Sequence, residues 1–283
     1  MKKQKIYIVA GPTASGKSEL ALKLAEHKKG QIVNADAFQV YQGLRVLTAR
    51  PSIKEEAQVP HFLYGFVDNQ TQISVFDWLK KVSEILPDLS CPIVTGGTGM
   101  YIHALINGIN QMPEIPEEIR QFVRQMDDEE RIQRLKNNEC PLDPQRQKRA
   151  LEVLLATGKP ISYFQNQPNI QLVKADFVPI LLQPSREIIY KKCADRLEKM
   201  FESGAIEEVK NLLKSKACGG VMKAIGVPEI IQYLNHNISL EEAKEKILLS
   251  TRHYAKRQRT WFNHQYAPKM VLETPFLEDV ITL

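Results

Sequence analysis

Residues 6–18 read IYIVAGPTASGKS, and this stretch decides the fold. Residues 6–10 are apolar and mostly β-branched or aromatic, which is typical of a buried strand. Residues 11–18 fit the pattern G-x-x-x-x-G-K-[ST], whose glycines let backbone N–H groups point at phosphate oxygens. The loop consists of Gly11, Pro12, Thr13, Ala14, Ser15, Gly16, Lys17 and Ser18. The sequence therefore predicts a polyphosphate-binding loop; the alternative is a glycine-rich turn that only connects a strand to a helix.

Helical and strand patterns alternate after this loop. Apolar residues recur at helical spacing from Leu20 to Ala25, and Gly30 lies where a C-capping glycine is expected. Strand character returns at residues 32–33 and again at residues 92–94, which run into another glycine-rich turn. This order predicts an α/β fold with a P-loop NTPase-like parallel sheet, whose ligands bind beyond the carboxyl ends of the strands.

The composition changes near residue 112, where prolines and charges of both signs become frequent. Apolar residues at helical spacing form one stripe there, made of Ile119, Phe122, Val123 and Met126. Strand-like sequence resumes at residues 177–182, so the segment between is predicted to be a small all-helical insertion domain. The predicted domains are 1–111 (first part of the core), 112–174 (insertion) and 175–283 (core completion and a helical C-terminal region). Helices are expected at 186–202, 205–215, 226–235 and 240–266.

The overall composition is that of an ordinary globular protein. The chain has 283 residues, 38 Lys and Arg against 33 Asp and Glu, and a formal net charge of +5. Its four cysteines are far apart, which disfavours disulfide scaffolds and structural zinc sites. No apolar run approaches the roughly 20 residues that span a bilayer. We therefore expect a cytoplasmic, monomeric protein with no membrane association and no obligate protein partner.

The loop motif assigns chemistry to two of its residues. Lys17 is expected to reach the terminal phosphates, and the Ser18 hydroxyl is expected to bind Mg²⁺. An ATPase or GTPase would usually add an apolar strand that ends in a metal-binding aspartate. The strand at residues 92–94 ends instead in Thr-Gly-Gly-Thr, which leaves enzymes that bind a small diphosphate or a nucleotide.

Four motifs together resemble the tRNA dimethylallyltransferase family. They are the phosphate-binding loop, residues 34–51 (NADAFQVYQGLRVLTARP), residues 96–101 (GGTGMY) and residues 251–262 (TRHYAKRQRTWF). They occur in the family order and cover nearly the whole chain. The resemblance implies transfer of the dimethylallyl group from dimethylallyl diphosphate to the exocyclic N6 of an adenine beside the anticodon of tRNA.

The resemblance also implies roles for particular residues. Asp36 corresponds to the family's general base, and Thr98 to the threonine that contacts the diphosphate near the leaving oxygen. The residues implied to contact the tRNA anticodon stem-loop are Asp36, Ala37, Phe38, Gln39, Gln145, Arg146, Gln147, Lys148, Arg149, Arg252, Lys256, Arg257, Gln258, Arg259, Thr260, Trp261, Phe262 and Asn263. The chain departs from the family pattern at Ala37 and Phe38, which replace Ser-Met, and its insertion is short.

The residue types suit this reaction. An adenine amine is a weak nucleophile, and a carboxylate that accepts its proton typically accelerates such a step by about 10²–10⁴-fold. Asp36 has the alternative role of capping a turn or helix. Lys17, Mg²⁺, Thr98 and a C-terminal arginine such as Arg257 are candidates to stabilise the leaving diphosphate. Thr98 has the alternative role of a turn residue after two glycines.

To be recognised and modified, the adenine beside the anticodon must be turned out of its base stack into a pocket. Gln39 has the amide for hydrogen bonds to an adenine edge, and Phe38 has a ring that stacks on a base. The alternatives are a surface glutamine and a core aromatic residue.

Two basic runs are candidates for binding RNA phosphates. Residues 251–264 contain four cations and no acidic residue, and positions 252, 256 and 259 share one helix stripe. The alternative is a solvated helix face. Arg146, Lys148 and Arg149 form a second cluster, for which the alternative is ordinary pairing with Asp143 and Glu152.

Three other functions remain open at this point. An adenylate isopentenyltransferase shares the loop but needs no RNA-binding surface. A small-molecule P-loop kinase would use Lys17 on ATP and Asp36 as base for a hydroxyl. A non-catalytic RNA-binding module would carry an unused nucleotide loop.

Overall fold

A six-stranded parallel sheet organises the larger part of the chain. The computed structural model describes residues 3–136 and 140–281, and its strand order is β3-β2-β4-β1-β5-β6. The strands are β1 (Lys5–Ala10), β2 (Gln31–Asn34), β3 (His61–Phe62), β4 (Pro92–Gly96), β5 (Asp176–Leu182) and β6 (Met270–Leu272). All their pairings are parallel. The predicted α/β fold is confirmed.

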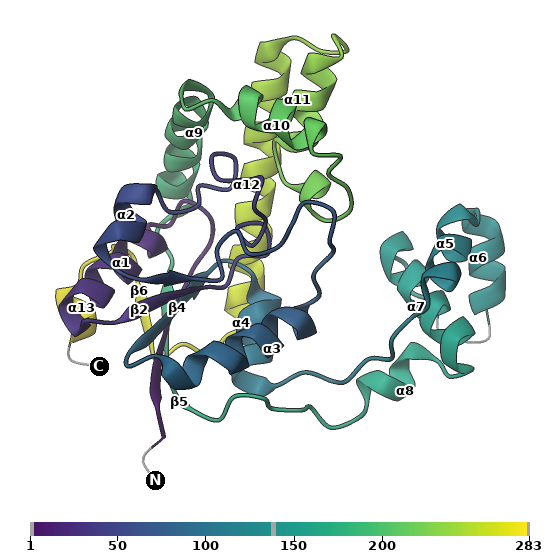
Figure 1. Cartoon of the computed structure of the whole chain (residues 1–283), viewed down its shortest axis with the longest axis horizontal. Helices are drawn as coiled ribbons and strands as arrows, with labels where there is room; N and C mark the ends of the chain where they lie inside the picture. Colours follow the sequence, from purple (N-terminus) through teal and green to yellow (C-terminus); the bar gives the residue numbers. More distant parts are fainter. Residues whose placement is uncertain (1–2, 137–139, 282–283) are drawn as a thin grey trace. The chain divides into compact units, whose positions relative to one another are not determined.

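The chain divides into two compact units, residues 1–106 with 172–283, and residues 107–171. The helices of the first unit are α1 (Lys17–Lys28), α2 (Ile53–Gln58), α3 (Val75–Ile85), η1 (Leu86–Asp88), α4 (Gly99–Asn107), α9 (Arg186–Glu202), α10 (Ala205–Lys214), η2 (Val221–Lys223), α11 (Val227–Leu234), α12 (Leu240–Gln265) and α13 (Glu278–Ile281). The four helices α9 to α12 pack on one another (Figure 1). Their bounds agree closely with the helices predicted from residue 186 onward.

Burial explains the first strand and helix. Residues 6–10 of β1 are buried, and the apolar residues of α1 from Leu20 to Ala25 pack against the sheet in one core. The end of α1 differs from the prediction, because the left-handed C-capping residue is Lys29 (φ 52°) and not Gly30. Gly30 is required for another reason: a Cβ there would lie 2.6 Å from the carbonyl oxygen of Cys91.

The second unit is helical and has its own small core. It contains α5 (Glu117–Gln125), α6 (Asp128–Leu135), α7 (Pro144–Thr157) and α8 (Ile161–Gln165). Val123 and Met126 of the predicted stripe are buried with Leu135, whereas Phe122 is 48% exposed. The unit spans 107–171, compared with the predicted 112–174, because an antiparallel bridge between Ile109 and Ile170 closes its base.

Among the described residues, no helix is both long enough and apolar enough to cross a membrane.

Candidate active site

The carboxyl ends of the central strands bring three loops to one edge of the sheet. The phosphate-binding loop follows β1, the turn that begins with Asp36 follows β2, and the Gly97–Thr98 turn follows β4. Because β2, β4 and β1 are consecutive neighbours in the sheet, their loops are adjacent despite long sequence separations. The three predicted catalytic elements therefore meet at one place.

The phosphate-binding loop has the backbone that its glycines predict. A Cβ at Gly11 would collide with the carbonyl oxygen of Leu182, and Gly16 adopts a φ of 98°. Helix α1 begins directly after Gly16, so its unpaired N–H groups and positive dipole end face the loop. The buried hydroxyl oxygen of Ser15 has no hydrogen-bond partner among the described residues. This geometry fits an anion held by backbone N–H groups.

Lys17 lies in a desolvated position inside this loop. Its ammonium donates to the carbonyl oxygen of Pro12 at 3.2 Å. The pKa of Lys17 is lowered to about 8, chiefly by burial; the negative charge of Asp36 opposes this shift, and the positive charge of Arg196 contributes to it. An anionic ligand would restore the charge balance around the ammonium.

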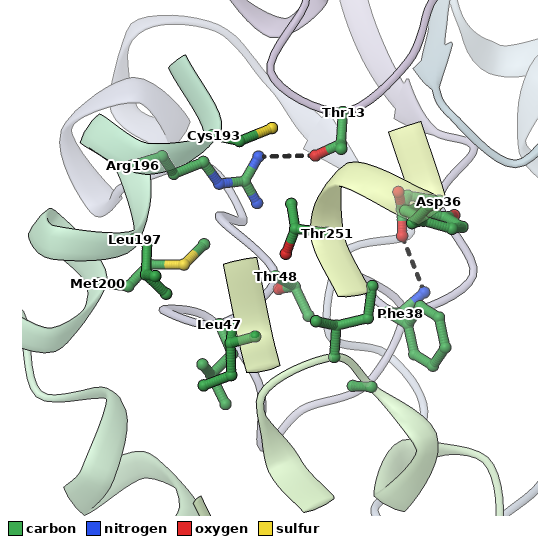
Figure 2. Close-up of a pocket in the computed structure, with 14 residues that line it drawn as sticks. Thr13, Asp36, Phe38, Leu47, Thr48, Cys193, Arg196, Leu197, Met200 and Thr251 are labelled. Atoms are coloured by element: carbon green, nitrogen blue, oxygen red, sulfur yellow. Dashed lines mark hydrogen bonds between the residues drawn. The ribbon is translucent and has the colours of Figure 1, made fainter. Parts of the chain in front are cut away.

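Asp36 shows the turn-capping role and retains a free oxygen. Its Oδ1 accepts the backbone N–H of Phe38 at 2.9 Å, which closes the turn (Figure 2). The buried side chain of Asn34 fixes the same turn from the strand end, accepting the N–H of Asp36 at 2.9 Å. No described residue donates a hydrogen bond to the second oxygen, Oδ2, so one carboxylate oxygen remains available to a substrate proton.

Thr98 connects two of the loops. Its hydroxyl oxygen accepts the backbone N–H of Ala37 at 2.9 Å, and its own N–H donates to the carbonyl oxygen of Ala35 at 3.3 Å. Thr98 therefore has the turn role that the sequence left open as an alternative. Its hydroxyl group can still donate a hydrogen bond to a ligand.

A pocket joins Asp36 to a guanidinium that sequence reasoning missed. Arg196 of α9 donates from Nη1 to the hydroxyl oxygen of Thr13 at 3.1 Å, at the rim of the phosphate-binding loop (Figure 2). Asp36 and Arg196 line the same pocket, and the charge of Asp36 partly offsets the burial that lowers the pKa of Arg196. One signal pointed to it: Arg196 lies one turn after Cys193, next to the buried apolar stripe of its helix.

Apolar side chains form the rest of this pocket. They were not predicted, and they come from a loop after β2 and from α9 and α12: Leu47, Leu197, Met200 and Ile247. Phe38, which is half-buried, also lines this pocket (Figure 2). Gln39 is differently placed, because its amide donates to the backbone carbonyl oxygens of Thr48 and Ala49.

Helix α12 divides the predicted basic run between two sides. Lys256 and Arg257 are exposed. The guanidinium of Arg252 instead lies over the Tyr190 ring at 5.2 Å, and that of Arg259 donates to the carbonyl oxygen of Pro184 at 3.2 Å. Arg257 does not line the pocket that contains Asp36, whereas Arg196 does.

Two predicted RNA contacts in this helix are interior residues. Gln258 and Phe262 are 6% and 1% exposed, which leaves them almost no surface for RNA. Thr260 and Asn263 are exposed, and Trp261 is half-buried against the backbone of Gly99.

The second basic run, in α7, divides in the same way. Gln145 and Arg146 are exposed, and Lys148 is half-buried. Gln147 is 6% exposed and donates to the carbonyl oxygen of Pro141 at 2.8 Å. Arg149 pairs with Glu152 at 3.5 Å, which is the alternative that the sequence left open.

The metal prediction involves only Ser18. Its exposed side chain borders a cavity of about 250 Å³ next to Thr95 at the end of β4. Among the described residues, no group of three or more His, Cys, Asp and Glu side chains is placed to hold a metal ion. The Ser18 hydroxyl is the kind of oxygen ligand that Mg²⁺ takes, together with water and phosphate oxygens.

The fold and the loop define a P-loop protein, built on an NTPase-like parallel sheet. A family model described as IPP transferase matches residues 39–265, and one described as isopentenyl transferase matches residues 4–71. The chain belongs to the IPP transferase family.

Relatives of known name agree with this assignment. A tRNA dimethylallyltransferase of Bartonella henselae is 42% identical, over 96% of this chain and 99% of its own length. A solved tRNA delta(2)-isopentenylpyrophosphate transferase from Staphylococcus epidermidis is 29% identical, with a TM-score of 0.72, and covers 99% of this chain and 98% of its own. A solved eukaryotic dimethylallyltransferase acting on tRNA is 26% identical, with a TM-score of 0.79 over 96% of this chain and 74% of its own.

Proposed function

We propose that this protein transfers the dimethylallyl group of dimethylallyl diphosphate to N6 of an adenine beside the anticodon of tRNA. The observation that carries the proposal is a single pocket in which Asp36 lies beside Arg196, next to the phosphate-binding loop. The names of the relatives support the reaction class and the tRNA substrate. Because tRNA is cytoplasmic, we propose that location for the protein.

The diphosphate is proposed to bind at residues 11–18. The loop N–H groups, the Lys17 ammonium and the Arg196 guanidinium would neutralise its charge, and the negative charge that grows on the leaving oxygen would be stabilised most. Mg²⁺ bound at Ser18 would add a further positive charge next to the phosphate oxygens. The apolar residues Leu197 and Met200 would contact the five-carbon chain and exclude water from it.

Asp36 is proposed to act as the general base. The bond between the adenine nitrogen and the first carbon of the donor forms while the bond from that carbon to the diphosphate oxygen breaks. The amine proton passes to the free Oδ2 of Asp36, whose position is fixed because Oδ1 is held by the Phe38 N–H. Thr98, which is tied to this turn through Ala37, would donate its hydroxyl proton to the departing diphosphate.

The exposed cations of α12 are proposed to bind tRNA phosphates. Lys256 and Arg257 border a surface cavity with Trp261, and this cavity offers both charge and an aromatic face. In the second unit, Arg146 is exposed at the start of α7, where it would bind RNA without disturbing the core. An enzyme that modifies only free AMP would need neither surface.

The test is prenyl transfer to RNA. Purified protein is incubated with Mg²⁺, labelled dimethylallyl diphosphate and unmodified tRNA, and the RNA is analysed for a five-carbon adduct on adenine. We expect labelled tRNA, and no label when that adenine is replaced by guanine. Transfer to free AMP but not to tRNA would overturn the proposal, as would consumption of ATP without any transfer.

A further inference from the structure

Gln258 is a buried polar residue inside the most basic helix of the chain. It is 6% exposed and lies on the inner face of α12, with the buried residues Ala255 and Phe262. Burial of an amide is unfavourable unless its donors and acceptors are satisfied. The partners of Gln258 therefore indicate why an amide is placed there.

Both ends of the Gln258 amide bind backbone groups of substrate loops. Its Oε1 accepts the N–H of Thr13 in the phosphate-binding loop at 2.8 Å. Its Nε2 donates to the carbonyl oxygen of Gly97, in the turn after β4, at 2.8 Å. A Cβ at Gly97 would collide with this Nε2, so the glycine and the glutamine are matched in size. One side chain thus joins two loops of the site.

Tyr254, one turn earlier on α12, extends this connection to the third loop. Its hydroxyl lies within hydrogen-bonding reach of the side chains of Thr98 and Gln258, and burial raises its pKa, so it keeps its proton. Thr98 in turn accepts the N–H of Ala37, next to Asp36. The loops after β1, β2 and β4 are therefore all connected to the inner face of one helix.

We propose that Gln258 is a positioning residue for the phosphate-binding loop, which it holds against the Gly97 turn in the shape that receives the donor diphosphate. Thr13 is fixed from two sides, because Gln258 binds its N–H and Arg196 binds its hydroxyl oxygen. With the Thr13 N–H held by Gln258, the loop N–H groups that follow it are the ones left for phosphate. Gln258 acts through Thr13 and Gly97 and needs no contact with substrate or RNA.

The substitution Gln258→Glu tests this role through pH. A carboxylate still accepts the Thr13 N–H but cannot donate to Gly97, whereas a protonated carboxyl restores both bonds. Burial favours the neutral form, so protonation is expected within a mildly acidic range. The probe is inorganic pyrophosphate with Mg²⁺, titrated calorimetrically into the full-length protein at pH 8 and pH 5.5.

At pH 8 we expect the Kd of the variant for pyrophosphate to exceed that of the wild type about tenfold. This factor corresponds to the loss of one buried hydrogen bond. At pH 5.5 the ratio of the two Kd values is expected to fall below about threefold, because the donor returns. Equal Kd values at pH 8, or a ratio that does not change with pH, would overturn the proposal.

Gln31→Glu is the matched control. Gln31 also uses its amide to accept a backbone N–H, that of Cys91 at 3.2 Å, and to donate to Ser90 at 3.0 Å. It begins β2, at the sheet edge opposite the site, so its variant is expected to bind pyrophosphate like the wild type. A loss as large as that of Gln258→Glu would show a general effect of replacing a hydrogen-bonded amide by a carboxylate and overturn the positioning role.

Amide hydrogen exchange, measured without substrate, tests this inference separately from the proposed function. The expected changes in KM, by contrast, rest on the proposed function. Gln258→Met has a similar length and lacks both hydrogen bonds, and in this variant we expect faster amide hydrogen exchange at residues 11–18, with unchanged exchange in β5. Unchanged exchange in the loop would overturn the proposal even if the protein prenylates tRNA. In steady-state transfer assays the KM of the donor should rise and that of tRNA should not; the reverse pattern would make Gln258 an RNA contact.

Discussion

The loops at the sheet edge and the basic runs in the helices differ in how closely the structure follows the sequence. In the loops, Lys17, Asp36 and Thr98 come from three distant segments and lie together. In the runs, residues that are neighbours in sequence separate: Lys256 is exposed whereas Gln258 is buried.

The difference has a physical cause. A glycine-rich loop is specified by backbone conformation and by N–H groups, which local sequence determines directly. A run of charges on a helix has no such constraint, because a rotation of about 100° per residue decides which members meet the protein and which meet water. Composition therefore predicts a charged helix, but only packing assigns each side chain to a partner.

The largest expected effect is a loss of turnover when Asp36, in the loops at the sheet edge, is replaced. Asp36→Asn preserves the acceptor for the Phe38 N–H but removes the proton acceptor, so turnover should fall about 10²–10⁴-fold. Binding of tRNA, measured by filter retention, should stay within a few fold. An Asn variant that retains the wild-type rate would exclude Asp36 as the base and leave it only the turn.

The second-largest effect is expected on pyrophosphate binding, when the arginine that lines the pocket is replaced. Arg196→Ala should weaken pyrophosphate binding roughly 10–100-fold, because charge-assisted hydrogen bonds contribute about 1.5–3 kcal/mol. Arg257→Ala, which removes an exposed guanidinium outside the pocket, should leave that Kd unchanged. Calorimetry on both variants decides between them, and a larger loss for Arg257 would favour the earlier, sequence-based choice. Circular dichroism must show that the Arg196 variant is folded.

Lys17 predicts a pH dependence of donor binding. Its pKa is lowered to about 8 by burial, so the ammonium is charged below that pH and neutral above it. Affinity for pyrophosphate should therefore be constant below about pH 8 and fall by up to about tenfold per pH unit above it. Because the charge of Asp36 raises this pKa, Asp36→Asn should move the midpoint to lower pH. Lys17→Arg, which stays protonated, serves as the control; a decline in the Arg variant as steep as in the wild type would exclude Lys17 as its source.

Much of the fold was predictable, for reasons visible in particular residues. The apolar run before the loop predicts a strand, the sequence from residue 186 onward predicts helices, and the structure confirms both. Arg196 was missed because its role depends on α9 meeting Thr13, a contact between residues 183 positions apart. Gln258 was assigned to RNA because the family resemblance implies tRNA contacts at residues 256–263, whereas its partners Thr13 and Gly97 are revealed only by tertiary structure.

The smallest expected effect tests the helices themselves. If exposed cations bind RNA phosphates, Lys256→Ala should lower the salt dependence of tRNA binding, the slope of log K against log salt, by about one unit. Arg252→Ala, in the same run, should leave the slope unchanged, because this half-buried side chain holds its guanidinium over the Tyr190 ring. The pair is matched in charge and helix, so it isolates side-chain direction. Equal slopes for the two variants would mean that the whole run acts as one electrostatic surface, and the distinction between its two sides would then concern packing alone.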